Sequence, residues 1–299
     1  MKRPDDPPPD PRRRANRIPT PPADPQRHAR AIAQAVEETW HRAHGTGDVE
    51  VPVSVIAGLS LIAPDDTDTD TVAGLLLDCD TAAFTRLMRA QWSVFVHARP
   101  DLVVPAWPLL AVWHGEPGLD QPATCAARQV AHAAIRAGQL HLTGTDRRRK
   151  VDLFGPVLTA LRSHTDRRAR GQFYTPAEVS TLIAGLLGPP QPGQVVHEPA
   201  AGTGGMLRAV AQAMREAGRD PAEVAWVAVD TDPLAIACLA VNTVLWHLGP
   251  YVLLGVGDAL TADWITRAVA QRRHTLELAR HIGQARTILA ALRGIHPDR

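Results

Sequence analysis

Apolar residues between residues 28 and 163 recur mostly at the spacing of α-helices. Three segments show this pattern clearly: ARAIAQAVEETWHRAHG (29–45), DTAAFTRLMRAQWSVFVHA (80–98) and ATCAARQVAHAAIRAGQL (123–140). Apolar positions three and four residues apart form one face of an amphipathic helix. Glycine or proline ends the helical segments, as at Gly45 and Pro100. The pattern predicts an all-α region of five to seven helices.

Beyond Gly171 the pattern changes to helices that alternate with short apolar runs. The segment TPAEVSTLIAGLLG begins with Thr175, Pro176 and Glu178 at the positions of an N-cap, a first helical residue and a capping-box acid. Strands are expected within residues 194–200, 224–230 and 251–258, with helices over 204–218 and 232–249 between them. Strands linked by helices at this spacing predict right-handed crossovers and a parallel sheet.

The predicted fold class is therefore α/β, with an N-terminal all-α domain followed by a partial, Rossmann-like parallel sheet. The expected parts are a disordered Pro/Arg-rich tail (1–27), a helical domain (28–165), a sheet domain (166–261) and a C-terminal helical segment (262–299).

Three strands in the order 3-2-1 would leave the first strand at an edge of the sheet. The final helix could cover that edge, or another chain could complete the sheet. The apolar side of this helix would be formed by Trp264, Ile265, Val269, Leu276, Leu278, Ile282, Ile288, Leu289 and Leu292.

Composition favours a soluble, cytoplasmic protein with no membrane contact. Hydrophobic residues make up 45% of the 299 residues, but no run is apolar enough for a transmembrane span, and the first residues lack the apolar core of a secretory signal. The three cysteines, Cys79, Cys125 and Cys238, are far apart, which favours reduced, buried thiols over a metal or redox site.

The net charge of +1 conceals clusters of basic residues. They lie at Arg12–Arg14, Asp146–Lys150, Asp166–Gly171 and Arg272–Arg273. Such clusters can contact phosphates, so DNA is a candidate partner. The alternative is an ordinary solvated surface.

The segment VHEPAAGTGGM (196–206) contains the pattern of a ligand-binding turn. It predicts a strand that ends at Glu198, a turn rich in glycine and a helix that begins near Gly205. Such a turn directs backbone N–H groups and the positive end of a helix dipole at one point. Glycines at 202, 204 and 205 would let a ligand approach the main chain closely.

Three acids, Glu198, Asp230 and Asp258, lie at the carboxyl ends of the three predicted strands. In parallel sheets these ends form the crevice where ligands bind. Asp230 could accept the ribose hydroxyls of a nucleoside, and Asp258 could reach an adenine amino group. A dinucleotide fold lacks an acid and a proline before its glycines, and Glu198 would repel a pyrophosphate. A cationic ligand fits better, which favours S-adenosylmethionine.

Four segments in this order resemble a known family: GQFYTPAEV (171–179), HEPAAGTGGML (197–207), AVDTDPLAIACLAVN (228–242) and GDAL (257–260). They resemble the adenine-specific N6 DNA methyltransferases, above all the modification subunits of type I restriction-modification systems. The resemblance covers roughly residues 152–261. It implies a methyltransferase domain that uses S-adenosylmethionine, and as partners DNA and a specificity or complementary catalytic subunit.

Carried over to this sequence, the resemblance implies roles for nine residues. Tyr174, Thr175 and Pro176 would line the methionine end of the cofactor. The loop around it would contain Glu198, Ala200, Gly202 and Gly204, while Asp230 would hold the ribose and Asp258 the adenine. Simpler roles are open for some residues: Thr175 as a helix cap, Asp232 as an N-cap, and Asn242 as a helix residue that hydrogen-bonds a loop.

The family's catalytic loop, Asn-Pro-Pro-aromatic or a close variant, is missing. Its oxygens accept the hydrogens of the target amino group and its aromatic ring stacks on a flipped-out base. The only asparagines are Asn16 and Asn242, and neither precedes a proline pair. The family pattern thus stops after its third motif, and no catalytic or metal-binding residue is assigned.

Three hypotheses follow. The chain is a methylase-like protein that binds S-adenosylmethionine and is inactive alone; it is one half of a split adenine-N6 methyltransferase; or it is a degenerate interaction protein without catalysis.

Overall fold

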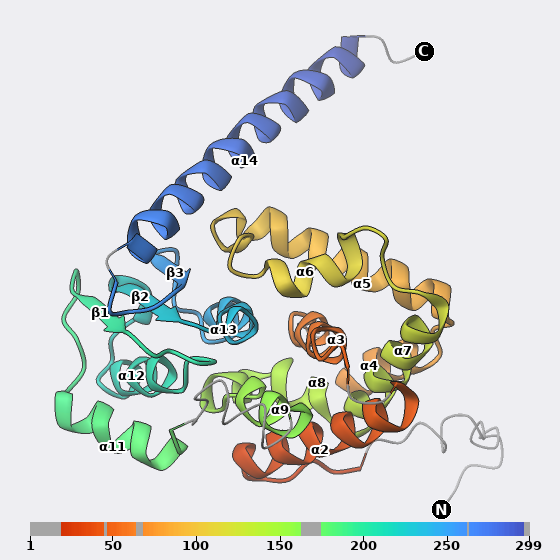
Figure 1. Ribbon diagram of the computed structural model, residues 1–299, viewed down its shortest axis with the longest axis horizontal. Helices are drawn as coiled ribbons and strands as arrows, with labels where there is room; N and C mark the ends of the chain where they lie inside the picture. Colours follow the sequence, from red (N-terminus) through yellow and green to blue (C-terminus); the bar gives the residue numbers. More distant parts are fainter. Residues whose placement is uncertain (1–18, 45–46, 64–67, 163–174, 262, 296–299) are drawn as a thin grey trace, which may run out of the picture.

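The computed structural model describes residues 19–44, 47–63, 68–162, 175–261 and 263–295, without the side chains of 44 and 291–295. A body of helices packs beside a small sheet with its own helices, and one long helix projects from the molecule (Figure 1). The helical body consists of α2 (Pro25–His44), α3 (Glu50–Ser60), α4 (Thr69–Leu77), α5 (Thr81–Ala98), η1 (Pro100–Leu102), α6 (Trp107–His114), α7 (Gln121–Arg136), α8 (Gln139–Thr143), η2 (Asp146–Lys150) and α9 (Phe154–Leu161).

These are eight α-helices within the described residues, against the five to seven expected. Part of the difference arises at Gly138, which takes a left-handed conformation with φ of 87°. This residue is the N-cap of α8 and lies just after the end of α7, so the segment 123–140 is not one continuous helix. Glycine adopts this conformation without the steric cost that a side chain would add.

Helix α2 begins at Pro25, inside the range expected to be a tail. Asp24 accepts hydrogen bonds from the backbone N–H groups of Gln26 (3.0 Å) and Arg27 (3.2 Å). An aspartate cap followed by proline at the first helical position is a strong helix start. The helical body therefore starts three residues earlier than residue 28.

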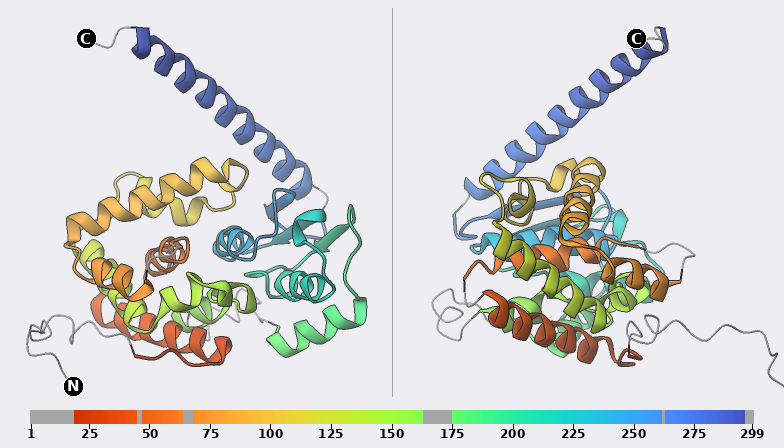
Figure 2. Two further views of the ribbon diagram at one scale, coloured as in Figure 1. Left: turned by 180° about the vertical axis from the view of Figure 1, so that it is seen from behind. Right: turned by 90° about the vertical axis from the view of Figure 1, so that its right-hand side faces the viewer.

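Helix α3 lies at the centre of the helical body, and all of its residues from Val51 to Ser60 are buried. Two views show it surrounded by the other helices and by α13 (Pro233–Leu245) of the sheet region (Figures 1 and 2). Its buried Ser54 donates to the carbonyl of Leu109 (2.7 Å) and accepts from the indole N–H of Trp113 (2.9 Å). The Ser54 hydroxyl and the Trp113 indole N–H are thus satisfied within this core.

The described residues form one parallel sheet of three strands in the order β1-β2-β3. Strands β1 (Val195–Glu198), β2 (Ala225–Asp230) and β3 (Val252–Val256) are joined by α12 (Gly205–Glu216) and α13, with η3 (Pro221–Glu223) before β2. In the register, Glu198 pairs with Ala228 and Asp230 with Val256. The predicted strands, their order and the edge position of β1 are confirmed.

One cluster of buried apolar side chains extends from the helical body into the sheet region. Helix α13 connects the two, because it contacts α3 and α6 on one side and β2 and β3 on the other. It is buried almost throughout, from Leu234 to Leu245. Movement of the sheet relative to the helices would therefore expose this shared core.

The predicted capping box at Thr175 is wrong. Helix α11 spans Ala177–Leu187, its N-cap is Pro176, and no side chain caps it within the described residues. The carbonyl of Pro176 accepts the backbone N–H of Ser180 at 3.0 Å. Pro176 has an extended conformation (ψ 144°), so the helix starts one residue later than predicted and Thr175 falls outside it.

The final helix α14 (Asp263–Ile295) runs through Gly283 without a break. Its first turns cover one face of the sheet, where Trp264 packs against Val229 and stacks on His197 with ring centroids 6.1 Å apart. A side chain at Gly255 would collide with the Trp264 ring. This glycine therefore makes room for the indole.

Beyond these turns α14 leaves the body (Figure 1). Ile265, Val269, Leu278, Ile282, Ile288 and Leu289, all expected on its packed side, are exposed. Val195 on β1 is also 62% exposed. The expectation that α14 covers the edge of β1 is thus wrong.

The three cysteines are free thiols; Cys238 is buried, whereas Cys79 and Cys125 are only half-buried. Across the described ranges, no three His, Cys, Asp or Glu residues are grouped so that they could hold a metal ion. No helix in the same ranges has the length and apolar character needed to cross a bilayer.

Candidate cofactor site

The turn between β1 and α12 is held in place by hydrogen bonds to β2. The backbone N–H of Gly202 donates to Asp230 Oδ2 at 2.7 Å, and the N–H of Ala201 donates to the carbonyl of Val229 at 3.0 Å. Within the turn, the N–H of Ala200 donates to Glu198 Oε1 at 3.2 Å. The loop is therefore fixed by hydrogen bonds to residues of β1 and β2.

Glycine is required at position 204 for two reasons. Its φ of 97° lies in the left-handed region, which side chains disfavour. A Cβ atom there would also collide with Leu239 and lie 2.9 Å from Cζ3 of Trp246. Gly202 is left-handed as well, with φ of 52°. These two glycines let the chain turn tightly from β1 into α12.

The three predicted acids lie at the same edge of the sheet. Glu198 and Asp230 are the last residues of β1 and β2, and Asp258 follows the end of β3 by two residues. Asp230 is half-buried and also accepts the N–H of Asp232 at 2.9 Å. Asp258 is exposed and accepts the N–H of Leu260 at 2.9 Å. The structure thus brings these carboxylates to the carboxyl ends of three adjacent strands.

A buried network behind the loop joins it to the helical body. Thr203 Oγ1 donates to Asp152 Oδ2 at 2.5 Å, and Asn242 Nδ2 donates to Asp152 Oδ1 (3.0 Å) and to the carbonyl of Thr203 (2.8 Å). Phe154 and Gly155 donate their backbone N–H groups to Asp152 Oδ1 (3.0 and 3.3 Å). Asn242 therefore hydrogen-bonds the loop, as one reading of the sequence predicted.

Removal from water raises the pKa of the Asp152 carboxyl, whereas hydrogen bonds from Thr203, Asn242 and Gly155 and the charge of Arg208 oppose the rise. Sequence reasoning missed Asp152. Its only local signal is an acid two residues before the helix α9, and acids are common at ordinary helix starts.

A second buried contact ties the sheet region to the helical body. Arg162 Nη1 and Nη2 lie 2.5 and 3.2 Å from the two carboxylate oxygens of Asp232, and both side chains are almost fully buried. Asp232 also caps α13, because its Oδ1 accepts the N–H of Leu234 at 3.1 Å. The predicted N-cap is confirmed, and the ion pair is an addition that the sequence did not reveal.

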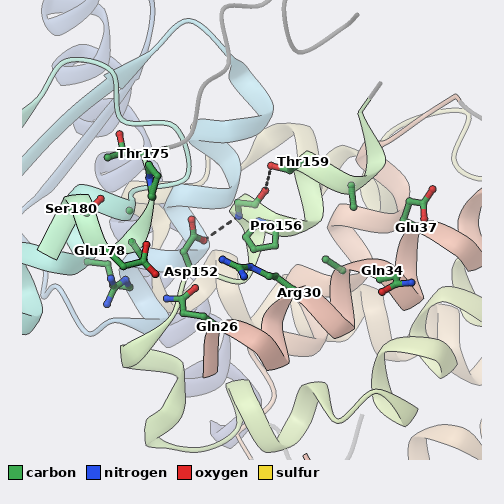
Figure 3. Close-up of a pocket in the computed structure, with 17 residues that line it drawn as sticks. Gln26, Arg30, Gln34, Glu37, Asp152, Pro156, Thr159, Thr175, Glu178 and Ser180 are labelled. Carbon is green, nitrogen blue, oxygen red and sulfur yellow. Dashed lines mark hydrogen bonds between the residues drawn. The ribbon is translucent and has the colours of Figure 1, made fainter. Parts of the chain in front are cut away.

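A cavity of about 500 Å³ lies between the helical body and the start of the sheet region. Figure 3 shows its walls, which come from α2, α9, the start of α11 and the start of α12. Arg30, Glu37, Asp152, Glu178 and Arg208 supply charged groups to the lining. Burial lowers the pKa of Arg208, and the nearby charge of Asp152 opposes this.

Ser180 gives the cavity an unused hydrogen-bonding group. The residue is buried and lines the cavity, and its hydroxyl oxygen has no hydrogen-bond partner among the described residues. A Cβ placed on Gly205 would lie 4.0 Å from this oxygen, so the hydroxyl faces the start of α12. A buried polar atom without a partner is costly, and a polar ligand in the cavity would remove that cost.

The predicted site residues fall into two groups. Thr175 and Pro176 line the cavity, whereas Glu198, Ala200, Gly202, Gly204, Asp230 and Asp258 do not. The second group forms the loop and the strand ends, and Gly205 at the start of α12 belongs to the cavity wall. Tyr174 lies outside the described residues.

Residues 150–275 match the model of the family described as N-6 DNA Methylase. Among solved structures, the chain is similar to the methyltransferase subunit of a type I restriction-modification system from Streptococcus thermophilus, with 13% sequence identity and a TM-score of 0.39. The similarity covers 79% of this chain and 60% of that subunit. No curated protein matches the sequence. The segment 150–275, which holds the sheet and the loop, belongs to the N-6 DNA methylase family.

Proposed function

We propose that the chain binds S-adenosylmethionine at the carboxyl ends of its three strands. One observation carries the proposal: the backbone of the glycine turn is fixed to Asp230 in a segment of the N-6 DNA methylase family. The strand-end acids offer carboxylates to a ligand that carries a sulfonium, an ammonium and a nucleoside.

The residues present fit this cofactor. Asp230 and Asp258 would accept ribose hydroxyls and an adenine amino group, and Glu198 suits the positive charge of the sulfonium end. Thr175, Pro176 and the unpartnered Ser180 hydroxyl would surround the methionine end. When bound, the cofactor would supply an activated methyl group on its sulfur.

We propose further that the chain alone does not methylate adenine. The printed sequence contains no Asn-Pro-Pro-aromatic motif, and its two asparagines are Asn16 and Asn242. Asn242 is buried and its amide nitrogen is bound to Asp152 and Thr203. It therefore has no path to a target base.

The exposed edge of the sheet supports a second candidate, a split adenine-N6 methyltransferase. Within the described residues β1 pairs only with β2, and Val195 remains exposed. A strand from a second chain could pair there and could bring the catalytic loop to the strand ends. DNA and a restriction-modification subunit are the partners that fit either candidate.

Calorimetric titration of the purified chain with S-adenosylmethionine tests the cofactor. We expect saturable heat that is lost in Asp230→Ala. Asp258→Ala, which alters an exposed side chain, should weaken binding without affecting the fold. If the wild-type chain gives no heat, cofactor binding is ruled out and a degenerate interaction protein is favoured. Transfer of labelled methyl groups to DNA by the chain alone would contradict the proposed inactivity.

A further inference from the structure

A cluster of cationic groups lies at the other end of α12 from the cofactor loop. It consists of Arg148 and Arg149 from η2, Arg215 from the last turn of α12, and His247, which follows α13. Arg215 lies ten residues after Gly205, which is about 15 Å along an α-helix. We call this group the η2 cluster.

The side chains of the η2 cluster are held together by contacts between elements. Arg149 Nη2 donates to His247 Nδ1 at 3.5 Å, and Arg215 Nη2 donates to the carbonyl of Trp246. Burial, together with the charges of Arg149, Arg148 and Arg215, lowers the pKa of His247, while Asp146 opposes the shift. His247 thus lies within the electrostatic field of all three arginines.

The positive charge of the cluster is poorly balanced. Asp146 lies 3.5 Å from Arg149, but its side chain is 81% exposed, which weakens the attraction. For Arg215, burial and the charge of Arg149 lower the pKa and the charge of Asp220 raises it. Neighbouring Arg147 is engaged elsewhere, with the carbonyls of Pro22 (2.5 Å) and Ala23 (3.2 Å).

The cluster also contains hydrogen-bond donors without acceptors. Arg148 Nε, Arg149 Nε and Arg215 Nη1 are buried and have no hydrogen-bond partner in the part of the chain that the structure describes. An unsatisfied buried donor on a charged group costs more than one on a neutral group. These three donors come from two elements and belong to guanidinium groups, which favours an anion with several acceptor oxygens. A phosphate group carries enough oxygens and matches guanidinium geometry.

We propose that the η2 cluster is a phosphate-binding site. The phosphate belongs to a nucleic-acid backbone or to a small phosphorylated molecule, and the choice of duplex DNA as the first ligand to test rests on the proposed function. The site lies at the opposite end of the sheet from the cofactor loop, so binding there leaves the loop free.

The test compares duplex DNA binding by the wild-type chain, by Arg148→Gln/Arg149→Gln, and by a charge-matched control, Arg42→Gln/Arg86→Gln, which alters exposed residues of α2 and α5. We expect the cluster variant to bind about tenfold more weakly in fluorescence anisotropy, with the slope of log affinity against log salt reduced by about two. If its affinity and salt slope equal those of the control, the cluster does not contact DNA.

A measurement on the wild-type fold covers the case in which the variant misfolds. The NMR titration of the His247 ring, assigned with His247→Gln, should show a higher pKa when inorganic phosphate or duplex DNA is added, since a bound anion offsets the arginine charges. A rise with phosphate but not with DNA assigns the site to small phosphates. No rise with either overturns the proposal. Calorimetry with S-adenosylmethionine on the cluster variant separates this outcome from failure of the cofactor proposal.

Discussion

Thr203 in the glycine turn donates a 2.5 Å hydrogen bond to Asp152, which precedes it by 51 residues. Asp152 belongs to the end of the helical body, and the turn belongs to the proposed cofactor site. Asn242 from α13 donates to the same carboxylate. The position of the turn therefore depends on the helical body as well as on the sheet.

Replacing Asp152 with Asn should destabilise the fold and loosen the turn. The carboxylate accepts hydrogen bonds from Thr203, Asn242, Phe154 and Gly155, whereas an amide offers one acceptor oxygen and turns an NH₂ group toward these donors. We expect a loss of about 2 kcal/mol in the free energy of unfolding, measured with urea. Glu223→Gln, the same chemical change at an exposed residue, should cost little. Equal stability of the two variants would contradict the structural role of Asp152.

A comparison of Gly204→Ala with Gly218→Ala separates the cost of backbone strain from the cost of a steric collision. At Gly204 an added methyl group meets Leu239 and Trp246, whereas at Gly218, which has φ of 71°, nothing lies within 4 Å. We expect Gly218→Ala to cost about 1 kcal/mol from conformation alone, and Gly204→Ala to cost at least about 3 kcal/mol. Thermal unfolding of both variants measures the difference. Similar costs would mean that the turn is less tightly packed than the structure shows.

The buried ion pair between Arg162 and Asp232 should dominate the docking of the two regions. Asp232→Asn preserves the cap on α13, because Asn caps as well as Asp, but removes the negative charge that faces the buried guanidinium of Arg162. We expect a loss of about 3 kcal/mol in the free energy of unfolding. Asp220→Asn is the matched control, because Asp220 also caps a helical turn that begins with proline but is exposed. The ion pair would be unimportant if both variants lost the same stability.

His132 on α7 should make the fold sensitive to acid. Burial, with smaller contributions from Arg128 and Arg136, lowers its pKa from 6.5 to about 4, while Asp78 opposes the shift. Above pH 6.5 the ring is neutral in both the folded and unfolded states. As the pH falls from 6.5 towards 4, the unfolded chain takes up a proton that the folded chain does not, so stability is lost.

Because the ring is partly solvated, we expect the loss from His132 to be about 1–2 kcal/mol. The measurement is urea unfolding at pH 7.5 and pH 4.5 for the wild type and His132→Gln. The variant should lose less stability between the two pH values. An identical loss would show that His132 titrates normally in the fold.

Local patterns in the sequence were enough to predict the sheet region. Short apolar runs that end at Glu198 and Asp230, with helices between them, predicted the parallel strands and their order. Likewise, Asp232 before Pro233 predicted a helix cap. These features depend on neighbouring residues, so they are visible in one stretch of chain.

Contacts between distant segments could not be predicted in this way. Asp152 reads as an ordinary residue before a helix, and its partner Thr203 is revealed only by the fold. The direction of α14 depends on the space that Gly255 leaves for Trp264. The start of α11 differs by one residue from the prediction, because the extended Pro176 takes the position that the capping pattern gave to Thr175.

Hydrogen–deuterium exchange of the chain with and without S-adenosylmethionine tests the central proposal most directly, because it reports where the cofactor binds. We predict slower exchange of the backbone amides in residues 198–207 and near Asp230 and Asp258, and little change in α4 and α5. Unchanged exchange in the glycine turn at saturating cofactor, or protection confined to the helical body, would contradict the proposed site.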